Sequence, residues 1–213
     1  MPNLLPQEVT EKIKEILREM VNPITLVFFT DGKSPTVKET EQLLRETAQL
    51  SSKINVLVRD VNKDVEEAKK YAIQRVPSFV ILDQNLAYKG VKFNGIPAGH
   101  EINSYLSALL EMSGASSPLE GDLAKRIQAI KKPIDIKVFV TLSCPHCPGA
   151  VQTAHRLAME NGNIKAEMIE AQSFPELSRK YHVSSVPKIV INDQFELLGN
   201  QPIEAFLSEI EKA

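Results

Sequence analysis

Two kinds of hydrophobic pattern alternate along the chain. Runs dominated by apolar residues, such as 24–29 and 136–141, are typical of buried strands. Stretches in which apolar residues recur every three or four positions, such as 7–20, predict amphipathic helices. In the first half these patterns predict helices at 7–20, 36–50, 64–71 and 101–111, and strands at 24–29, 54–58, 79–82 and 86–89.

The second half repeats this order of elements. The segment 71–77, which ends in Val76-Pro77, matches 181–187, which ends in Val186-Pro187, at an offset of 110 residues. A shared period through strands, turns and prolines indicates a duplication. The predicted helices of this half are 119–130, 150–158, 175–181 and 203–210, and its strands are 136–141, 164–169, 189–191 and 195–198.

Each half is predicted to form an α/β fold with a mixed sheet flanked by helices. The first two strands of each half are joined by a helix and should run parallel, whereas the last two are joined by a short turn and should be antiparallel. A small, polar cluster at 114–118 is expected to link the first fold, 1–113, to the second, 119–213. This order of elements resembles the thioredoxin fold, present here as a tandem duplication.

Composition and charge narrow the class of protein. Hydrophobic residues make up 43% of the chain and charged residues 24%, and the net charge is -2. These values give no reason to expect nucleic acid or an anionic membrane as a partner. The N-terminus lacks the basic start and apolar core of a signal peptide, and no apolar run is long enough for a transmembrane helix. We therefore expect a cytoplasmic protein, in which a disulfide is more often catalytic than structural.

The chemistry is expected at the two cysteines, Cys144 and Cys147. They lie between a predicted strand and a predicted helix, which is the context of a dithiol redox site. The matching positions of the first half, within 30–36, contain no sulfur, so that fold is expected to be redox-inactive. A purely stabilising disulfide would close too short a loop to remove much chain entropy, and no second cysteine pair is present for a metal. An iron–sulfur cluster shared by two chains stays open.

Cys144 is the predicted nucleophile. Because it precedes a helix, unpaired backbone N–H groups and the helix dipole favour its thiolate, which is the form that attacks a disulfide. Cys147, one helical turn later, can then resolve the mixed disulfide. Pro145 and His146 belong to the same candidate site, and His146 is expected to stabilise the Cys144 thiolate; the alternative is an exposed side chain with little effect.

Three motifs together resemble one protein family: Thr141-Leu142-Ser143-Cys144-x-x-Cys147-Pro148, Val186-Pro187, and Pro97-Ala98-Gly99-His100-Glu101. It is the family of glutaredoxin-like protein disulfide oxidoreductases with two thioredoxin folds. Within it, the chain most resembles the N-terminal domain of the flavoprotein subunit of alkyl hydroperoxide reductase, which also pairs an inactive fold with an active one. Since no Gly-x-Gly-x-x-Gly motif is present, we expect no cofactor and a separate reductase as electron donor.

The resemblance implies roles for residues outside the cysteine motif. The Val186-Pro187 bond is expected to be cis and to pack beside Cys144, with Ser185 and Val186 as substrate-binding residues. An ordinary trans bond at the start of a strand is the alternative. Pro187 is counted with the catalytic residues on this basis.

The internal base of thioredoxins is missing from its usual place. Their buried Asp corresponds here to Val138, and their nearby Lys to Met168. In the resembled domain a Glu close to the redox centre corresponds to Glu101. We hypothesise that Glu101 helps to transfer protons at Cys147; the alternative is a helix-start carboxylate stabilised only by the helix dipole.

These inferences predict a thiol–disulfide oxidoreductase that cycles Cys144 and Cys147 between dithiol and disulfide. The resemblance implies a flavin disulfide reductase, similar to thioredoxin reductase, as donor and a peroxiredoxin or another disulfide-containing protein as acceptor. The motif does not fix the direction of electron flow, so a protein disulfide oxidase or isomerase is an alternative. A non-catalytic docking module or iron–sulfur cluster carrier is a second alternative.

Overall fold

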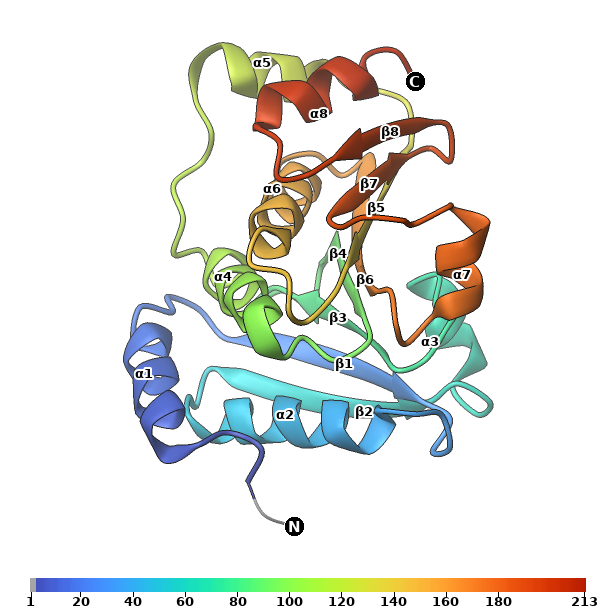
Figure 1. Ribbon diagram of the computed structural model, residues 1–213. Helices are drawn as coiled ribbons and strands as arrows, with labels where there is room; N and C mark the ends of the chain where they lie inside the picture. The colour runs from blue at the N-terminus through green and yellow to red at the C-terminus, as the bar shows by residue number, and fades with distance from the viewer. Residues whose placement is uncertain (1–2) are drawn as a thin grey trace. The chain divides into compact units, whose positions relative to one another are not determined.

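The computed structural model describes residues 3–213 (Figure 1). The first half of the chain contains α1 (Gln7–Leu17), β1 (Ile24–Thr30), α2 (Val37–Gln49), β2 (Ile54–Asp60), α3 (Val65–Lys70), β3 (Ser78–Leu82), β4 (Tyr88–Asn94), the 3-10 helix η1 (Gly99–Glu101) and α4 (Ile102–Met112). The second half contains α5 (Gly121–Ala129), β5 (Ile134–Val140), α6 (Cys147–Glu160), β6 (Ile164–Glu170), α7 (Pro175–Lys180), β7 (Lys188–Ile191), β8 (Phe195–Leu198) and α8 (Ile203–Ile210). The α/β class and the repeated order of elements are confirmed.

The chain divides into two compact units. The first unit comprises the residues up to 88, together with 93–96 and 106–116, and the second comprises residues 89–92, 97–105 and 117–213. Residues 97–105, which follow the first four strands, therefore belong to the same unit as the cysteines. The linker at 114–118 stays a prediction.

In the first unit, β1 lies between β2 and β3. It runs parallel to β2, with Ile24 opposite Ile54, and antiparallel to β3, with Phe28 opposite Phe79. The parallel pairing of β1 with β2 agrees with the sequence prediction. All but the last residue of β1 are buried, as expected for a central strand made almost entirely of apolar residues.

The predicted strand at 86–89 is wrong in its bounds, because β4 begins only at Tyr88 and continues to Asn94. The reason is a turn built around Asp83. Its carboxylate accepts hydrogen bonds from the backbone N–H groups of Asn85 and Ala87. Leu86, in the turn, has a positive φ of 58° and is 60% exposed, so its apolar side chain does not mark a strand.

In the second unit, β5 lies between β6 and β7, and β8 follows β7. β5 runs parallel to β6, with Val138 opposite Met168, and β7 forms an antiparallel hairpin with β8. The helices α6 and α7 flank this sheet from opposite sides (Figure 1). Apolar residues of α6 that are buried against the sheet fix its orientation: Ala150, Val151, Ala154, Leu157 and Ala158.

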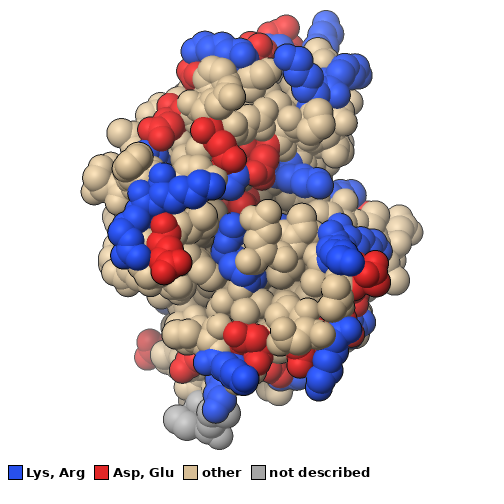
Figure 2. Space-filling model, turned by 90° about the vertical axis from the view of Figure 1, so that its right-hand side faces the viewer, with Lys and Arg blue, Asp and Glu red and all other residues tan. Residues whose placement is uncertain are grey.

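Charges of both signs are mixed on one face of the molecule. Figure 2 shows Lys and Arg side chains interspersed with Asp and Glu over the face that it draws. This agrees with a net charge of -2 in a chain with 25 basic and 27 acidic residues. Among residues 3–213, no helix is both long and apolar enough to span a membrane.

Candidate active site

The cysteine motif forms the start of α6. β5 ends at Val140, and a short loop then places Cys144, whose backbone N–H donates to the carbonyl oxygen of Thr141 (3.1 Å). α6 begins at Cys147, three residues earlier than predicted, with Pro148 in its first turn, where a missing N–H is tolerated. One cysteine therefore lies three residues before the helix and the other at its first position.

Cys144 and Cys147 form a disulfide with a Cα–Cα distance of 5.5 Å. Their exposure differs: Cys144 is 9% exposed and Cys147 is fully buried. A partner protein can therefore approach Cys144 but not Cys147. Pro145 and His146, between them, are exposed, and His146 makes no capping hydrogen bond to α6.

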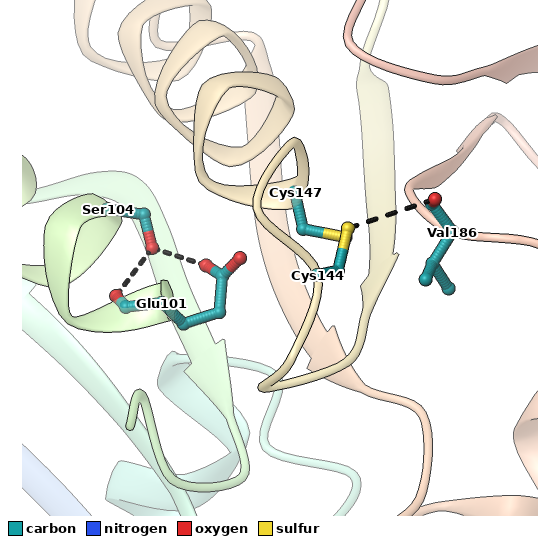
Figure 3. Close-up of a disulfide and its surroundings, with 5 residues drawn as sticks. All are labelled: Glu101, Ser104, Cys144, Cys147 and Val186. Atoms are coloured by element: carbon teal, nitrogen blue, oxygen red, sulfur yellow. Dashed lines mark hydrogen bonds between the residues drawn. A yellow bond between two sulfur atoms is a disulfide. The ribbon is translucent and has the colours of Figure 1, made fainter. Parts of the chain in front are cut away.

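The segment immediately before β7, which contains Val186-Pro187, lies beside the disulfide. The Val186-Pro187 bond is cis, as predicted, and so is Val76-Pro77. The Cys144 Sγ lies 3.8 Å from the Val186 carbonyl oxygen, and Figure 3 shows this group beside the disulfide. Val186 is half-buried and Ser185 is exposed, so this edge of the site faces solvent.

A carboxylic group lies near the disulfide within the same unit. Glu101, the last residue of η1, is fully buried, and its carboxyl group points toward the disulfide (Figure 3). Burial raises the pKa of Glu101 from 4.5 to about 7, although the Ser104 hydroxyl acts in the opposite direction. Its Oε1 has no hydrogen-bond partner among residues 3–213.

The helix dipole alone does not explain this burial. Glu101 immediately precedes α4, so the dipole favours its negative charge by about 0.3–1 kcal/mol. Transferring a carboxylate from water into the protein interior costs on the order of several kcal/mol. A carboxylate serving only the dipole would lie at the surface, where this cost is absent.

The segment that carries Glu101 is fixed to the loop that carries Cys144. The His100 backbone N–H donates to the Leu142 carbonyl oxygen (2.9 Å). Gly99 has a positive φ of 58°, and a Cβ atom at this position would overlap that carbonyl. Only glycine combines this conformation with so close an approach.

Ser104 was not among the site residues predicted from the sequence. Its hydroxyl lies within hydrogen-bonding distance of the Glu101 carboxylate oxygen Oε2 and of the Glu101 carbonyl oxygen (Figure 3). The available signal was the spacing of three between Glu101 and Ser104, which brings two side chains together on one face of a helix. The positions of the missing thioredoxin base, Val138 and Met168, are buried and lie opposite one another, so that place is apolar.

The first unit has a polar turn where the second has its cysteines. The Asp31 carboxylate accepts hydrogen bonds from the backbone N–H groups of Lys33 and Ser34 and from the Ser34 hydroxyl. These bonds, that of the Ser34 hydroxyl above all, lower the pKa of Asp31 to about 2. The turn precedes α2 as the cysteine loop precedes α6, but it has no group that could exchange disulfides.

Metal binding finds no support in the described part of the chain. No group of three or more His, Cys, Asp or Glu side chains there is arranged to hold a metal ion. The two sulfur atoms are joined to each other. A cysteine pair at the start of a helix is the chemical context of exchange between a dithiol and a disulfide.

Comparisons with known proteins agree with this geometry. A family described as "Thioredoxin domain" matches residues 134–212, and a family described as a domain of unknown function matches residues 8–95. A solved structure of the alkyl hydroperoxide reductase protein AhpF from Enterococcus faecalis is 32% identical, with a TM-score of 0.91 over 97% of this chain and 99% of that one. A protein disulfide oxidoreductase from Aeropyrum pernix K1 is 28% identical, with a TM-score of 0.88 over 97% of this chain and 92% of that one.

The fold and the site define a thiol–disulfide oxidoreductase of the thioredoxin fold, in which Cys144 and Cys147 form a disulfide. The chain belongs to the family of protein disulfide oxidoreductases with two thioredoxin folds, which includes the N-terminal domain of AhpF. The AhpF protein of Pseudomonas aeruginosa is 28% identical over 208 residues, which are 98% of this chain and 37% of that protein. The chain thus spans little more than a third of the length of such curated relatives.

Proposed function

We propose that the chain carries electrons from a flavin disulfide reductase to a disulfide in another protein, with a peroxiredoxin as the acceptor. The observation that carries the proposal is that Cys144 is slightly exposed whereas Cys147 is fully buried. Ser185, next to Val186 at the site, is exposed, so a partner protein can approach there. The relatives from Pseudomonas aeruginosa and Enterococcus faecalis belong to alkyl hydroperoxide reductases, which supports this choice of acceptor. The proposal places the protein in the cytoplasm, where such thiols are kept reduced.

The first step uses Cys144. In the reduced protein, its thiolate attacks one sulfur of the acceptor disulfide. A bond forms between Cys144 and the acceptor, the acceptor disulfide breaks, and one acceptor thiolate leaves. His146 and the unpaired N–H groups at the start of α6 stabilise the Cys144 thiolate.

The second step uses Cys147 and Glu101. The Cys147 thiol gives its proton to the Glu101 carboxylate, and the resulting thiolate attacks the Cys144 sulfur. The second acceptor thiolate leaves, so the acceptor has gained two electrons and the chain holds the Cys144–Cys147 disulfide. A dithiol of the flavin reductase then reverses both steps. The pKa of Glu101, about 7, suits an acceptor that must release its proton again near neutral pH.

Trapping tests this function. In Cys147→Ser the second step cannot occur, so we expect mixed disulfides through Cys144 to accumulate in cell extract. Mass spectrometry after reduction should identify a peroxiredoxin among the trapped proteins. Cys144→Ser is the control, since it keeps a single, buried cysteine and should trap little. If Cys147→Ser traps other proteins but never a peroxiredoxin, the proposed acceptor is wrong.

The direction of electron flow needs a second measurement. Equilibration of the Cys144–Cys147 pair with glutathione gives its reduction potential. A potential near that of thioredoxin, about −270 mV, supports the role of a reductant. A potential near −120 mV, roughly that of a strong oxidase, would favour the oxidase alternative.

A further inference from the structure

Ser104 is a buried hydroxyl with two possible acceptors, both on Glu101. It is 1% exposed and lies in the first turn of α4. Its Oγ lies 2.9 Å from the Glu101 carbonyl oxygen and within hydrogen-bonding distance of the carboxylate oxygen Oε2. A serine hydroxyl has one hydrogen, so it can donate to only one of these acceptors at a time.

The charge of Glu101 decides between the two acceptors. A hydrogen bond to an ionised carboxylate is roughly twice as strong as one between neutral groups. While Glu101 is ionised, the Ser104 hydrogen therefore goes to Oε2. Once Glu101 is protonated, Oε2 loses most of its advantage, and the hydroxyl can turn to the carbonyl oxygen without moving its own oxygen.

Oε1 is the oxygen left to receive a proton. It is buried, has no hydrogen-bond partner in the described part of the chain, and belongs to the carboxyl group that points toward the disulfide (Figure 3). By holding Oε2, Ser104 fixes the plane of the carboxyl group and keeps Oε1 on the side of the sulfur atoms.

We propose that Ser104 is the positioning residue for the proton acceptor: it holds Glu101 ionised and oriented until Cys147 gives up its proton. The proton passes from the Cys147 sulfur to Oε1, and the Ser104 hydrogen turns from Oε2 to the Glu101 carbonyl oxygen. When Glu101 releases the proton, the hydroxyl turns back. This inference rests on the proposed role of Glu101 in the second step.

On α6 and the loop before it, the titratable groups toward which the Glu101 carboxyl group points are the thiols of Cys147 and Cys144 in the reduced protein (Figure 3). His100, on its own segment, is exposed. In the disulfide form, burial and the Ser104 hydroxyl account for the shifted pKa, with no charged side chain among residues 3–213 contributing.

The test measures the second step as a function of pH. Protein carrying a mixed disulfide at Cys144 is followed by stopped flow between about pH 5.5 and about pH 9 as Cys147 releases the acceptor. A hydrogen bond to a charged group shifts a pKa by about one unit. In Ser104→Ala the apparent pKa of the profile should rise by about this amount, so that the rate near pH 6 falls about tenfold while the rate near pH 9 is unchanged.

Further variants separate the hydroxyl from its packing. Ser104→Thr keeps the hydroxyl and should retain the wild-type profile, whereas Ser104→Val has the same shape as the threonine variant without its hydroxyl and should behave like Ser104→Ala. This pair decides the question even if Ser104→Ala does not fold. Ser208→Ala in α8 is the matched control, because its hydroxyl also donates to a helix carbonyl oxygen, that of Glu204, and is exposed.

Two results would overturn the proposed role of Ser104, and a third would overturn the role of Glu101 on which it rests. If Ser104→Ala and Ser104→Val keep the wild-type pKa, or if Ser104→Thr shifts it as much as Ser104→Val does, the hydroxyl has no such role. If Glu101→Gln alone leaves the profile unchanged, the role of Glu101 fails first. If Glu101 does act, adding Ser104→Ala to Glu101→Gln should cause no further shift.

Discussion

The buried carboxylate of Glu101 should make the folded protein less stable at neutral and alkaline pH. Glu101 has a pKa of about 7 in the folded protein, against 4.5 when exposed. Below pH 4.5 it is protonated in both states and has no effect on the equilibrium. As the pH rises from 4.5 to about 7 the unfolded chain loses this proton while the folded protein keeps it, so the free energy of unfolding falls.

The size of the effect follows from the two pKa values. Each pH unit in this interval changes the free energy of unfolding by about 1.4 kcal/mol. Between pH 4.5 and about 7, the loss is therefore about 3 kcal/mol. Since a domain has a total stability of about 5–15 kcal/mol, a loss of this size is easily measured.

Replacing Glu101 by glutamine removes the titration. We expect the oxidised Glu101→Gln protein to match the wild type near pH 4.5 and to be more stable by up to about 3 kcal/mol near pH 8. The assay is urea unfolding of the disulfide form of both proteins at several pH values. Glu204→Gln is the control for the substitution itself, because Glu204 is an exposed carboxylate in the first turn of α8.

The difference between variant and wild type isolates this one group. Other titrating residues are common to both proteins and cancel. A constant difference across the whole pH range would refute the reasoning, since it would show that Glu101 ionises alike in the folded and unfolded states. A larger stability of the wild type at alkaline pH would show that the carboxylate is stabilised by its site.

The remaining predictions concern His155 and Gly99. Burial lowers the pKa of His155 from 6.5 to about 4, so between pH 6.5 and about 4 this residue should contribute a loss of stability of up to about 3 kcal/mol that His155→Leu lacks. The difference between the two proteins in urea unfolding at several pH values measures this contribution, and a difference that does not change with pH would contradict it. Gly99→Ala should destabilise more than Gly121→Ala, by about 1 kcal/mol or more, because both glycines have positive φ but only a Cβ at residue 99 meets Leu142, whereas residue 121 is open. Equal losses of melting temperature in the two variants would show that the close approach to Leu142 is relaxed at no cost.

Glu101 and His155 change the stability of the wild-type protein in opposite directions as the pH rises. Stability falls with rising pH because of Glu101 and rises with pH because of His155, over overlapping intervals. The two effects offset each other in the wild-type protein. In Glu101→Gln, stability should therefore rise with pH because of His155. In His155→Leu, it should fall with pH because of Glu101.

Local pattern was sufficient for most of the fold. The buried strands have apolar runs because both of their faces are covered, and the helices have one apolar face, so the sequence marks both directly. The repeat between Val76-Pro77 and Val186-Pro187 marked the duplication. The pattern failed at β4, where Leu86 looks like part of a strand but lies in the turn that Asp83 organises.

The sequence by itself determined the reactive pair, since Cys144 and Cys147 are the only two cysteines and lie between a strand and a helix. Only the tertiary structure decided what surrounds them. The full burial of Glu101, which gives its contact with Ser104 a consequence, follows from the packing of residues 97–105 against a loop that comes later in the chain, after β5. A pKa depends on burial and on hydrogen bonds formed in the folded structure. Neither produces a periodic pattern in the sequence.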